Sequence, residues 1–156
     1  RHYDTAAYRA RVEELRRRVP QIGIFADVIA GYPTETEADF EATAAFIREV
    51  NLAGLHVFSY SPRPGTPAAA LTQLPHEEIK RRSDALRALD KELRAAFAAS
   101  LVGTEQEVFI EEHKSGRPHG ITSNFQQVVL EDGAAHGLVR AVITRAEGPV
   151  CWAQKR

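Results

Sequence analysis

The sequence predicts an α/β unit followed by a small all-β module. In the first part, apolar side chains recur every three to four residues in helix-like segments. Between these segments stand nearly continuous apolar runs at 22–30 and 55–60, typical of strands in a parallel sheet. From Glu105 onward the pattern changes to short alternating runs separated by polar or glycine-rich turns. We therefore expect two domains, residues 1–102 and 103–156.

Composition limits the classes of function that remain. The 156 residues are 44% hydrophobic, enough for a substantial core, and the net charge of −1 gives no overall attraction to nucleic acid or anionic membranes. The single cysteine, Cys151, excludes an internal disulfide and a multi-cysteine metal site. No apolar run approaches the roughly 18 residues that a membrane span needs. We expect a cytoplasmic protein that binds no membrane, and any RNA binding would have to come from a local patch.

The first helix and first strand follow directly from spacing. Residues 5–19 place apolar side chains on one stripe, with Thr5 in the N-cap position and Pro20 as the stop. The strand at 22–30 is expected to be buried on both faces, and only Asp27 interrupts its apolar run.

Two further helices complete the α/β pattern. Residues 36–39 have the spacing of a capping box and begin a helix that continues to Val50. Pro75 opens a long helix that Gly103 ends, and the basic residues of this helix, Arg82 among them, are expected on its exposed surface. The order helix–strand–helix–strand with short loops favours parallel βα units.

The loop after the second strand is the first candidate for chemistry. Residues 61–67 read S-P-R-P-G-T-P and follow the carboxyl end of a strand, where α/β folds place ligand sites. Arg63 is suited to bind a carboxylate or phosphate through two hydrogen bonds, since the flanking prolines reduce the entropy cost of ordering the loop. A solvated loop arginine is the alternative.

Three segments carry a resemblance to a known family. D-V-I-A-G-Y-P-T-E-T-E-A-D-F at 27–40 and L-H-V-F-S-Y-S-P-R-P-G-T-P-A-A at 55–69 are similar to motifs of the radical-SAM methylthiotransferases. H-G-I-T-S-N-F at 119–125, between short strands, resembles the TRAM domain that ends these enzymes. The resemblance covers essentially the whole chain. It implies an α/β part formed by the last βα units of a partial (β/α) radical-SAM barrel, followed by a small TRAM-type β-barrel.

The resemblance also implies cofactors. Members of the family use S-adenosylmethionine and [4Fe–4S] clusters, and the cluster-binding cysteines are absent from this chain. The chain is therefore expected to be a piece of a longer enzyme, to form part of the S-adenosylmethionine pocket and to be inactive alone. The residues that match the implied pocket are Asp27, Gly31, Glu35, Phe58, Tyr60, Arg63 and Thr66.

Each of these residues also has a simpler interpretation. Asp27 either faces a polar cavity or is a structural carboxylate with nearby partners. Gly31 and Glu35 match the strand-end G-x-x-x-E of the family, although an acid before a helix is favourable through the helix dipole alone. Thr34 stands where the family usually has a second glycine, so the geometry of the turn is open.

The two aromatic residues at the end of the second strand are alternatives for the same role. One of Phe58 and Tyr60 is expected to stack on adenine while the other packs in the core, and we favour Phe58 at the base. Gly65 and Thr66 are expected to shape the loop, with the Thr66 hydroxyl as a further hydrogen-bond donor.

The all-β module combines cations with an aromatic residue, the composition of RNA-binding barrels that contact phosphates and stack on bases. The TRAM resemblance identifies the partner as tRNA, at its anticodon stem-loop. The candidate RNA-binding residues are Lys114, Arg117, His119, Asn124, Phe125 and Arg140. Cys151 and Trp152 are expected to close the core of the last strand, and no histidines have metal-ligand spacing.

Several substrates stay open within the resemblance. Arg63–Pro64 favours the tRNA-modifying branches over the branch that modifies an aspartate of a ribosomal protein. The A-G-L-H-V-F stretch at 53–58 favours the branch acting on threonylcarbamoyladenosine beside the anticodon, with the isopentenyladenosine branch as the alternative. A non-catalytic TRAM-type RNA-binding module is a further alternative. A generic small-molecule enzyme would need a nucleophile–base pair, and none is evident. The oligomeric state is open.

Overall fold

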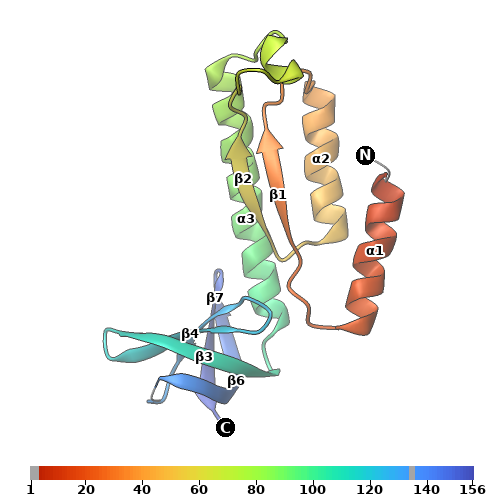
Figure 1. The fold of residues 1–156 in the computed structure, drawn as a ribbon. Helices are drawn as coiled ribbons and strands as arrows, with labels where there is room; N and C mark the ends of the chain where they lie inside the picture. Colours follow the sequence, from red (N-terminus) through yellow and green to blue (C-terminus); the bar gives the residue numbers. More distant parts are fainter. Residues whose placement is uncertain (1–3, 134–135) are drawn as a thin grey trace. The chain divides into compact units, whose positions relative to one another are not determined.

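The computed structural model describes residues 4–133 and 136–156 (Figure 1). In chain order its elements are α1 (Thr5–Arg18), β1 (Phe25–Ala30), α2 (Glu37–Val50), β2 (Gly54–Ser59), the 3-10 helix η1 (Pro67–Ala70), α3 (His76–Ser100), β3 (Glu105–Lys114), β4 (Arg117–Thr122), β5 (Gln127–Leu130), β6 (Gly137–Glu147) and β7 (Val150–Lys155).

The described chain divides into two compact units. The first unit contains residues 4–12 and 24–93, and the second contains residues 13–23 together with the described residues from 94 onward. The first is an α/β unit with a parallel sheet and the second contains a closed β-barrel. This sequence of fold classes is the predicted one, whereas the predicted domain boundary near residue 102, in the turn between α3 and β3, stays a prediction.

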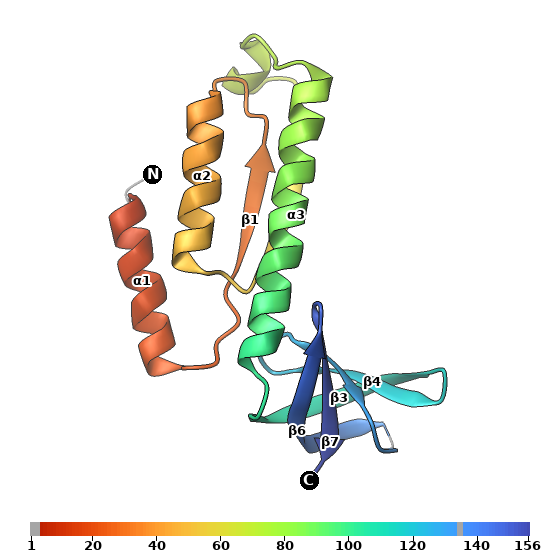
Figure 2. The same cartoon turned by 180° about the vertical axis from the view of Figure 1, so that it is seen from behind.

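The first unit is a layer of helices on a two-stranded parallel sheet. β1 and β2 pair in register from Phe25 with Gly54 to Ala30 with Ser59. α2 and α3 lie on one side of the sheet, as Figure 2 shows from behind. The buried residues between these layers are Ala30, Phe40, Ile47, Val50, Leu52, Leu55, Leu86, Leu89 and Leu93. Burial of this apolar surface is the main source of stability for the unit.

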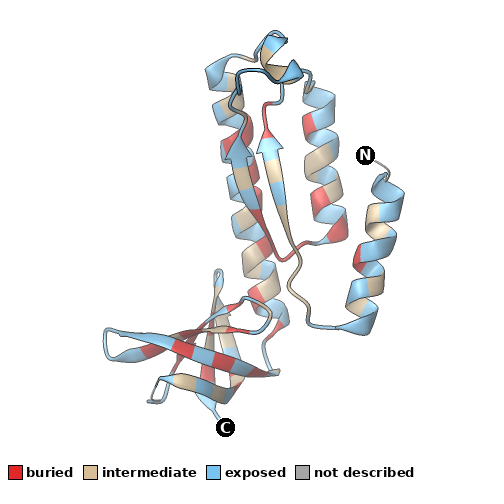
Figure 3. Ribbon diagram, viewed as in Figure 1, coloured by how far each residue is buried: buried red, intermediate tan, exposed pale blue. Residues whose placement is uncertain are grey.

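The other face of this sheet is open, which corrects the prediction of a first strand buried on both faces. Asp27 and Ile29 are exposed, as are their register partners His56 and Phe58. Figure 3 shows exposed residues on both strands. The reason is that the helices of this unit cover only one face, so alternate residues of each strand lack a covering layer among the described residues. Although the sequence of β1 is nearly continuously apolar, only one of its two faces is covered by the helices of this unit.

The helix starts are set by local hydrogen bonds. The α2 capping box is confirmed: Thr36 Oγ1 accepts a hydrogen bond from the Asp39 N–H at 3.1 Å, and Asp39 Oδ2 accepts one from the Thr36 N–H at 2.9 Å. At α1 the predicted cap is wrong by one residue. Asp4 Oδ1, and not Thr5, accepts from the Ala7 N–H at 2.8 Å. A carboxylate in this position also interacts favourably with the helix dipole.

The second unit closes five strands into a barrel in the order β3-β4-β5-β7-β6. Alternate residues of each strand point inward. The barrel core is formed by Ala98, Leu101, Val108, Ile110, Val128, Leu130, Ala141, Ile143, Cys151 and Ala153. The main chain of Gly103 is tied to this unit, because its N–H donates to the Ile143 carbonyl at 2.8 Å.

The segment at 119–125 differs from the sequence expectation. His119–Thr122 belong to strand β4 and do not link two strands. Gly120 is needed for the pairing of β3 with β4. A Cβ on this residue would lie 2.3 Å from the Phe109 carbonyl oxygen, so only glycine permits the two strands to approach this closely. A glycine in a short segment is typical of a turn, and here it is required by a neighbouring strand.

Among the helices that the structure describes, none is both long and apolar enough to cross a membrane.

Candidate functional site

A pocket of about 380 Å³ lies at the carboxyl end of β2. Its volume is within the range of small-molecule sites. It brings together four of the seven predicted cofactor residues. The residues that line it are Ile29, Phe58, Ser59, Tyr60, Ser61, Arg63, Thr66 and Ala68.

The two aromatic residues contribute differently to this pocket. Phe58 is 52% exposed on the open face of the sheet, next to Ile29 across the strand pair. Tyr60 is partly buried: its N–H donates to the Ala30 carbonyl at 2.8 Å and its ring meets Tyr32 edge-to-face at 5.5 Å. The Tyr60 hydroxyl is buried and has no hydrogen-bond partner among the residues described. Phe58 therefore offers an aromatic surface, and Tyr60 offers a polar atom that a ligand could satisfy.

The loop after β2 is closed by its own hydrogen bonds. The Thr66 hydroxyl donates to the Arg63 carbonyl at 2.8 Å, and the Thr66 N–H donates to the same oxygen at 3.2 Å. The hydroxyl hydrogen of Thr66 is thus used to shape the loop. The Arg63 side chain is exposed and forms no ion pair with any residue in the described ranges. Its guanidinium is available for an anionic ligand.

Gly31 and Glu35 lie together at the carboxyl end of β1, but the Glu35 carboxylate is turned into the fold. Its Oε2 accepts a hydrogen bond from the Gly31 N–H at 2.9 Å and another from Arg82 Nη1 at 2.8 Å. Neither Gly31 nor Glu35 lines the pocket beside Phe58. The arrangement fits the interpretation of Glu35 as a structural carboxylate. Its partner Arg82 was not predicted from the sequence.

Asp27 lies apart from the pocket at the end of β2. It lines a separate cavity of about 500 Å³ along the first strand, together with Tyr8, Tyr32, Thr43 and Phe46. The seven predicted cofactor residues are therefore divided among a pocket, the turn at 31–35 and a second cavity.

The position of Arg82 corrects the prediction of an exposed arginine on α3. Its side chain is 4% exposed, although the charge pattern of α3 favoured the surface. It is bonded to Glu35 and also to Glu78, through Nε at 2.7 Å. Burial alone lowers the pKa of Arg82, but the hydrogen bonds to Glu35 and Glu78 outweigh burial and raise the pKa overall. Its position three residues after Ile79 and four before Leu86, on the apolar stripe, was the available signal.

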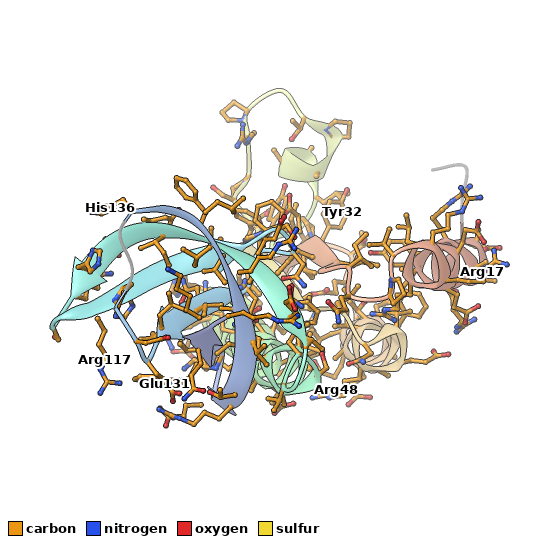
Figure 4. All side chains as sticks on the ribbon, turned by 90° about the horizontal axis from the view of Figure 1, so that it is seen from below. Arg17, Tyr32, Arg48, Arg117, Glu131 and His136 are labelled. Atoms are coloured by element: carbon orange, nitrogen blue, oxygen red, sulfur yellow. The ribbon has the colours of Figure 1, made fainter. Side chains whose placement is uncertain are left out.

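The candidate RNA-binding residues occupy three places on the barrel. Lys114 and Arg117 are register partners beside the β3–β4 turn, and His119 follows on β4. The Arg117 side chain points outward (Figure 4), and its guanidinium lies 4.9 Å from the centre of the Trp152 ring. Lys114 is paired with Glu112 at 2.5 Å.

The other three candidates lie elsewhere on this unit. Asn124 is used internally, since its Nδ2 donates to the Gln21 carbonyl at 2.9 Å and its Oδ1 accepts from the Thr122 hydroxyl. Phe125 follows in the turn and is 67% exposed. Arg140, on β6, is 3.6 Å from Glu107.

The side chains of Cys151 and Trp152 point to opposite sides of β7. Cys151 is in the barrel core, where burial raises its pKa to about 11. Trp152 points outward, with Arg145 4.1 Å from its ring centre and its Nε1 donating to Glu147 at 3.1 Å. The expectation that both residues close the core is therefore wrong for Trp152. Within the described ranges, no group of three His, Cys, Asp or Glu side chains could hold a metal ion.

No family model matches the chain, but several known proteins are similar to it. The chain is 41% identical to a protein of Cereibacter sphaeroides over 160 aligned residues, which cover all of this chain and 36% of that protein. It is 43% identical to a protein of Sorangium cellulosum over 77% of this chain and 24% of the relative. A protein of Aquifex aeolicus is 40% identical over 79% of this chain and 28% of the relative.

These relatives are tRNA-modifying enzymes by name. All three are named tRNA-2-methylthio-N(6)-dimethylallyladenosine synthase. The chain spans between about a quarter and about a third of their length.

The comparisons agree with the methylthiotransferase resemblance, but they give no support to the threonylcarbamoyladenosine branch and favour the dimethylallyladenosine alternative. Within the stretch at 53–58, from which that branch was predicted, Ala53, Gly54 and Leu55 are buried. Packing therefore constrains these residues, and their identity says little about the substrate.

Proposed function

We propose that this chain is part of a tRNA methylthiotransferase that adds a methylthio group to N6-dimethylallyladenosine, the isopentenyladenosine of the sequence-based alternative. The similarity to the Cereibacter sphaeroides protein over the whole chain supports this substrate. The observation that carries the proposal is the pocket that brings Phe58, Tyr60 and Arg63 together at the carboxyl end of a parallel strand.

The pocket fits S-adenosylmethionine in its chemistry. Phe58 presents an aromatic face on which adenine can stack, and the unpartnered Tyr60 hydroxyl can exchange a hydrogen bond with a polar group of the ligand. Arg63 supplies a cation for the carboxylate of the methionine part. Together with iron–sulfur clusters held outside these residues, S-adenosylmethionine would supply the radical chemistry of methylthio transfer. The residues described here would bind and orient it.

The barrel would contact the tRNA substrate. Arg117 and Lys114 stand together on the outer surface, and the ring of Trp152 lies beside Arg117. Exposed guanidinium and ammonium groups bind phosphates, and exposed aromatic rings such as Phe125 stack on unpaired bases. Asn124 shapes the turn that presents Phe125, because both ends of its side chain bond to the protein itself. We assign the anticodon stem-loop as the contacted part of the tRNA.

The test uses the full-length protein with its clusters reconstituted under anaerobic conditions. It is supplied with S-adenosylmethionine, dithionite as the electron donor, sulfide as the sulfur source and one of three anticodon stem-loops, which carry adenosine, dimethylallyladenosine or threonylcarbamoyladenosine at the same position. Mass spectrometry of the digested nucleosides should find the methylthio group on dimethylallyladenosine alone. Modification of threonylcarbamoyladenosine instead would overturn the assigned substrate.

A second candidate, a non-catalytic RNA-binding module, is favoured by the closed barrel with its own core. Titration of S-adenosylmethionine into the same reconstituted protein separates the two functions. Saturable binding that Phe58→Ala weakens supports the methylthiotransferase. RNA binding without any binding of S-adenosylmethionine would support the module.

A further inference from the structure

Arg82 is a buried cation at the centre of a polar cluster. Its Nη1 donates to the backbone carbonyl of Glu35 at 2.8 Å as well as to the Glu35 carboxylate. Its Nη2 lies 3.2 Å from Glu37, and its Nε bonds to Glu78. A buried guanidinium is costly unless its donors are satisfied, so these carboxylates fix the side chain in one geometry.

The same cluster reaches the end of β1 through a single atom. Glu35 Oε2 accepts from Arg82 and from the Gly31 N–H, so one carboxylate oxygen joins α3 to the strand end. One turn before Arg82, Ile79 packs against Gly31. A Cβ on residue 31 would lie 2.7 Å from Ile79 Cγ1, and the Gly31 φ is +81°. Ile79 and Arg82 thus hold the turn at 31–35 by contact and by hydrogen bonding.

The residue after Arg82 holds the end of the second strand. Ser83 is fully buried, and its hydroxyl shares a hydrogen bond of 2.8 Å with the hydroxyl of Ser59. Ser59 lines the pocket between Phe58 and Tyr60. The turn at 31–35 also reaches the pocket, since Tyr32 packs against the Tyr60 ring. One face of α3 therefore holds both strand ends that shape the pocket wall.

From these contacts we infer that Arg82 is a positioning residue for the cofactor pocket: through Glu35 it holds the turn at 31–35 against α3 and so sets where the Tyr32–Tyr60 pair stands. The inference rests on the proposed function, because the pocket is taken to hold S-adenosylmethionine. The geometry requires a planar fork. A lysine keeps the charge, but its single nitrogen cannot reach Glu35, Glu37 and Glu78 together as Nη1, Nη2 and Nε of the guanidinium do.

Arg81 provides a matched control. It neighbours Arg82 on α3 and pairs with the same Glu37 and Glu78, at 2.5 and 2.6 Å. Among the described residues Arg81 pairs with these two glutamates and not with Glu35, and the Arg81 side chain is 50% exposed. Arg81→Lys therefore alters the same ion-pair network without loosening the turn.

The experiment measures binding of S-adenosylmethionine and of the stem-loop RNA to the full-length reconstituted protein as wild type, Arg82→Lys, Glu35→Gln and Arg81→Lys. The expected result is a rise of about tenfold in the Kd for S-adenosylmethionine in Arg82→Lys and in Glu35→Gln, the order of one lost charge-assisted hydrogen bond. The RNA Kd and the iron content should stay at the wild-type level. Arg81→Lys should match wild type throughout.

Combining the two substitutions tests whether Arg82 and Glu35 act on the pocket through the same interaction. The double variant Arg82→Lys, Glu35→Gln should bind S-adenosylmethionine no more than about tenfold weaker than wild type, because both changes remove one interaction. An unchanged affinity for S-adenosylmethionine in Arg82→Lys, with a lowered melting temperature, would show a purely structural role and overturn the inference. Failure of the wild-type protein to bind S-adenosylmethionine would instead reject the proposed function.

Discussion

The guanidinium of Arg117 lies 4.9 Å from the centre of the Trp152 ring, although the two residues are on different strands of the barrel. This contact restrains a long cation on the outer surface and reduces the entropy lost when the cation binds a phosphate. Lys114 stands next to it but is paired with Glu112, which offsets part of its charge.

Arg117→Ala is therefore expected to weaken binding of the stem-loop more than Lys114→Ala. Loss of one phosphate contact should reduce the slope of log K against log salt by about 0.7 to 0.9. The measurement is RNA binding to the full-length protein at several salt concentrations. Arg87→Ala, an exposed arginine of α3 that is paired with Asp84, is the control and should leave the slope unchanged. Equal slopes for Arg117→Ala and wild type would remove the β3–β4 surface from the proposed RNA interface.

Arg63→Ala is expected to weaken binding of S-adenosylmethionine by about ten- to a hundredfold while the iron–sulfur clusters of the full-length protein assemble normally. The expected size follows from the loss of a charge-assisted pair with a carboxylate. Titration of S-adenosylmethionine gives the affinity, and iron analysis with the visible spectrum gives the cluster content.

Thr66→Val distinguishes the contribution of the Arg63 guanidinium to binding from that of the loop conformation. It removes the hydroxyl that donates to the Arg63 carbonyl and leaves the Arg63 side chain in place. A smaller loss of affinity is expected than for Arg63→Ala. Wild-type affinity in Arg63→Ala would rule out the guanidinium as a ligand of the cofactor.

Short-range features of this fold were predictable from sequence. The capping box at Thr36 and Asp39 depends on residues three apart, and the structure has both of its hydrogen bonds. The pocket-lining position of Arg63 was also accessible, because the end of a parallel strand is a place that topology alone marks for ligands. In the first case the physical cause lies within a few residues along the chain, and in the second it lies in the order of helices and strands, which the sequence pattern also indicates.

Long-range partners were not predictable in the same way. Arg82 and Glu35 are 47 residues apart, and the place of Arg82 on the apolar stripe of α3 indicates burial but does not indicate its partner. Gly120 was similarly ambiguous, since the Phe109 carbonyl that requires a glycine belongs to another strand. Such contacts depend on which segments meet in space, and a single sequence does not contain that information in its local periodicity.

Gly31→Ala is expected to destabilise the α/β unit by about 1–3 kcal/mol. The added methyl group would meet Ile79, and the positive φ of residue 31 is unfavourable for any residue with a Cβ. The measurement is thermal denaturation of the full-length protein. Gly65→Ala is the control, because its φ of +82° is similar but no atom lies within 4 Å of the added carbon. A clearly larger loss in Gly31→Ala assigns the difference to Ile79, and equal losses would show that the packing contact costs nothing.

Glu78 gives the cluster around Arg82 a defined dependence on pH. Hydrogen bonds from Arg81 and Arg82 lower the pKa of Glu78 to about 2, from an ordinary value of 4.5. A carboxyl group whose pKa is lowered by folding stabilises the folded state above its unfolded pKa, and this stabilisation is lost as the pH falls toward the folded value. The contribution of Glu78 should thus be complete near pH 7, begin to fall below about 4.5 and vanish near 2.

The corresponding prediction is that Glu78→Gln lowers the melting temperature of the full-length protein at pH 7 and that the difference from wild type shrinks between pH 5 and pH 3. The glutamine keeps the size of the side chain and does not titrate. Glu77→Gln, a charge-removing substitution on the same first turn of α3, is the control and is measured over the same pH range. If the melting temperatures of wild type and Glu78→Gln stay equally far apart down to pH 3, the ionised carboxylate of Glu78 does not stabilise this cluster.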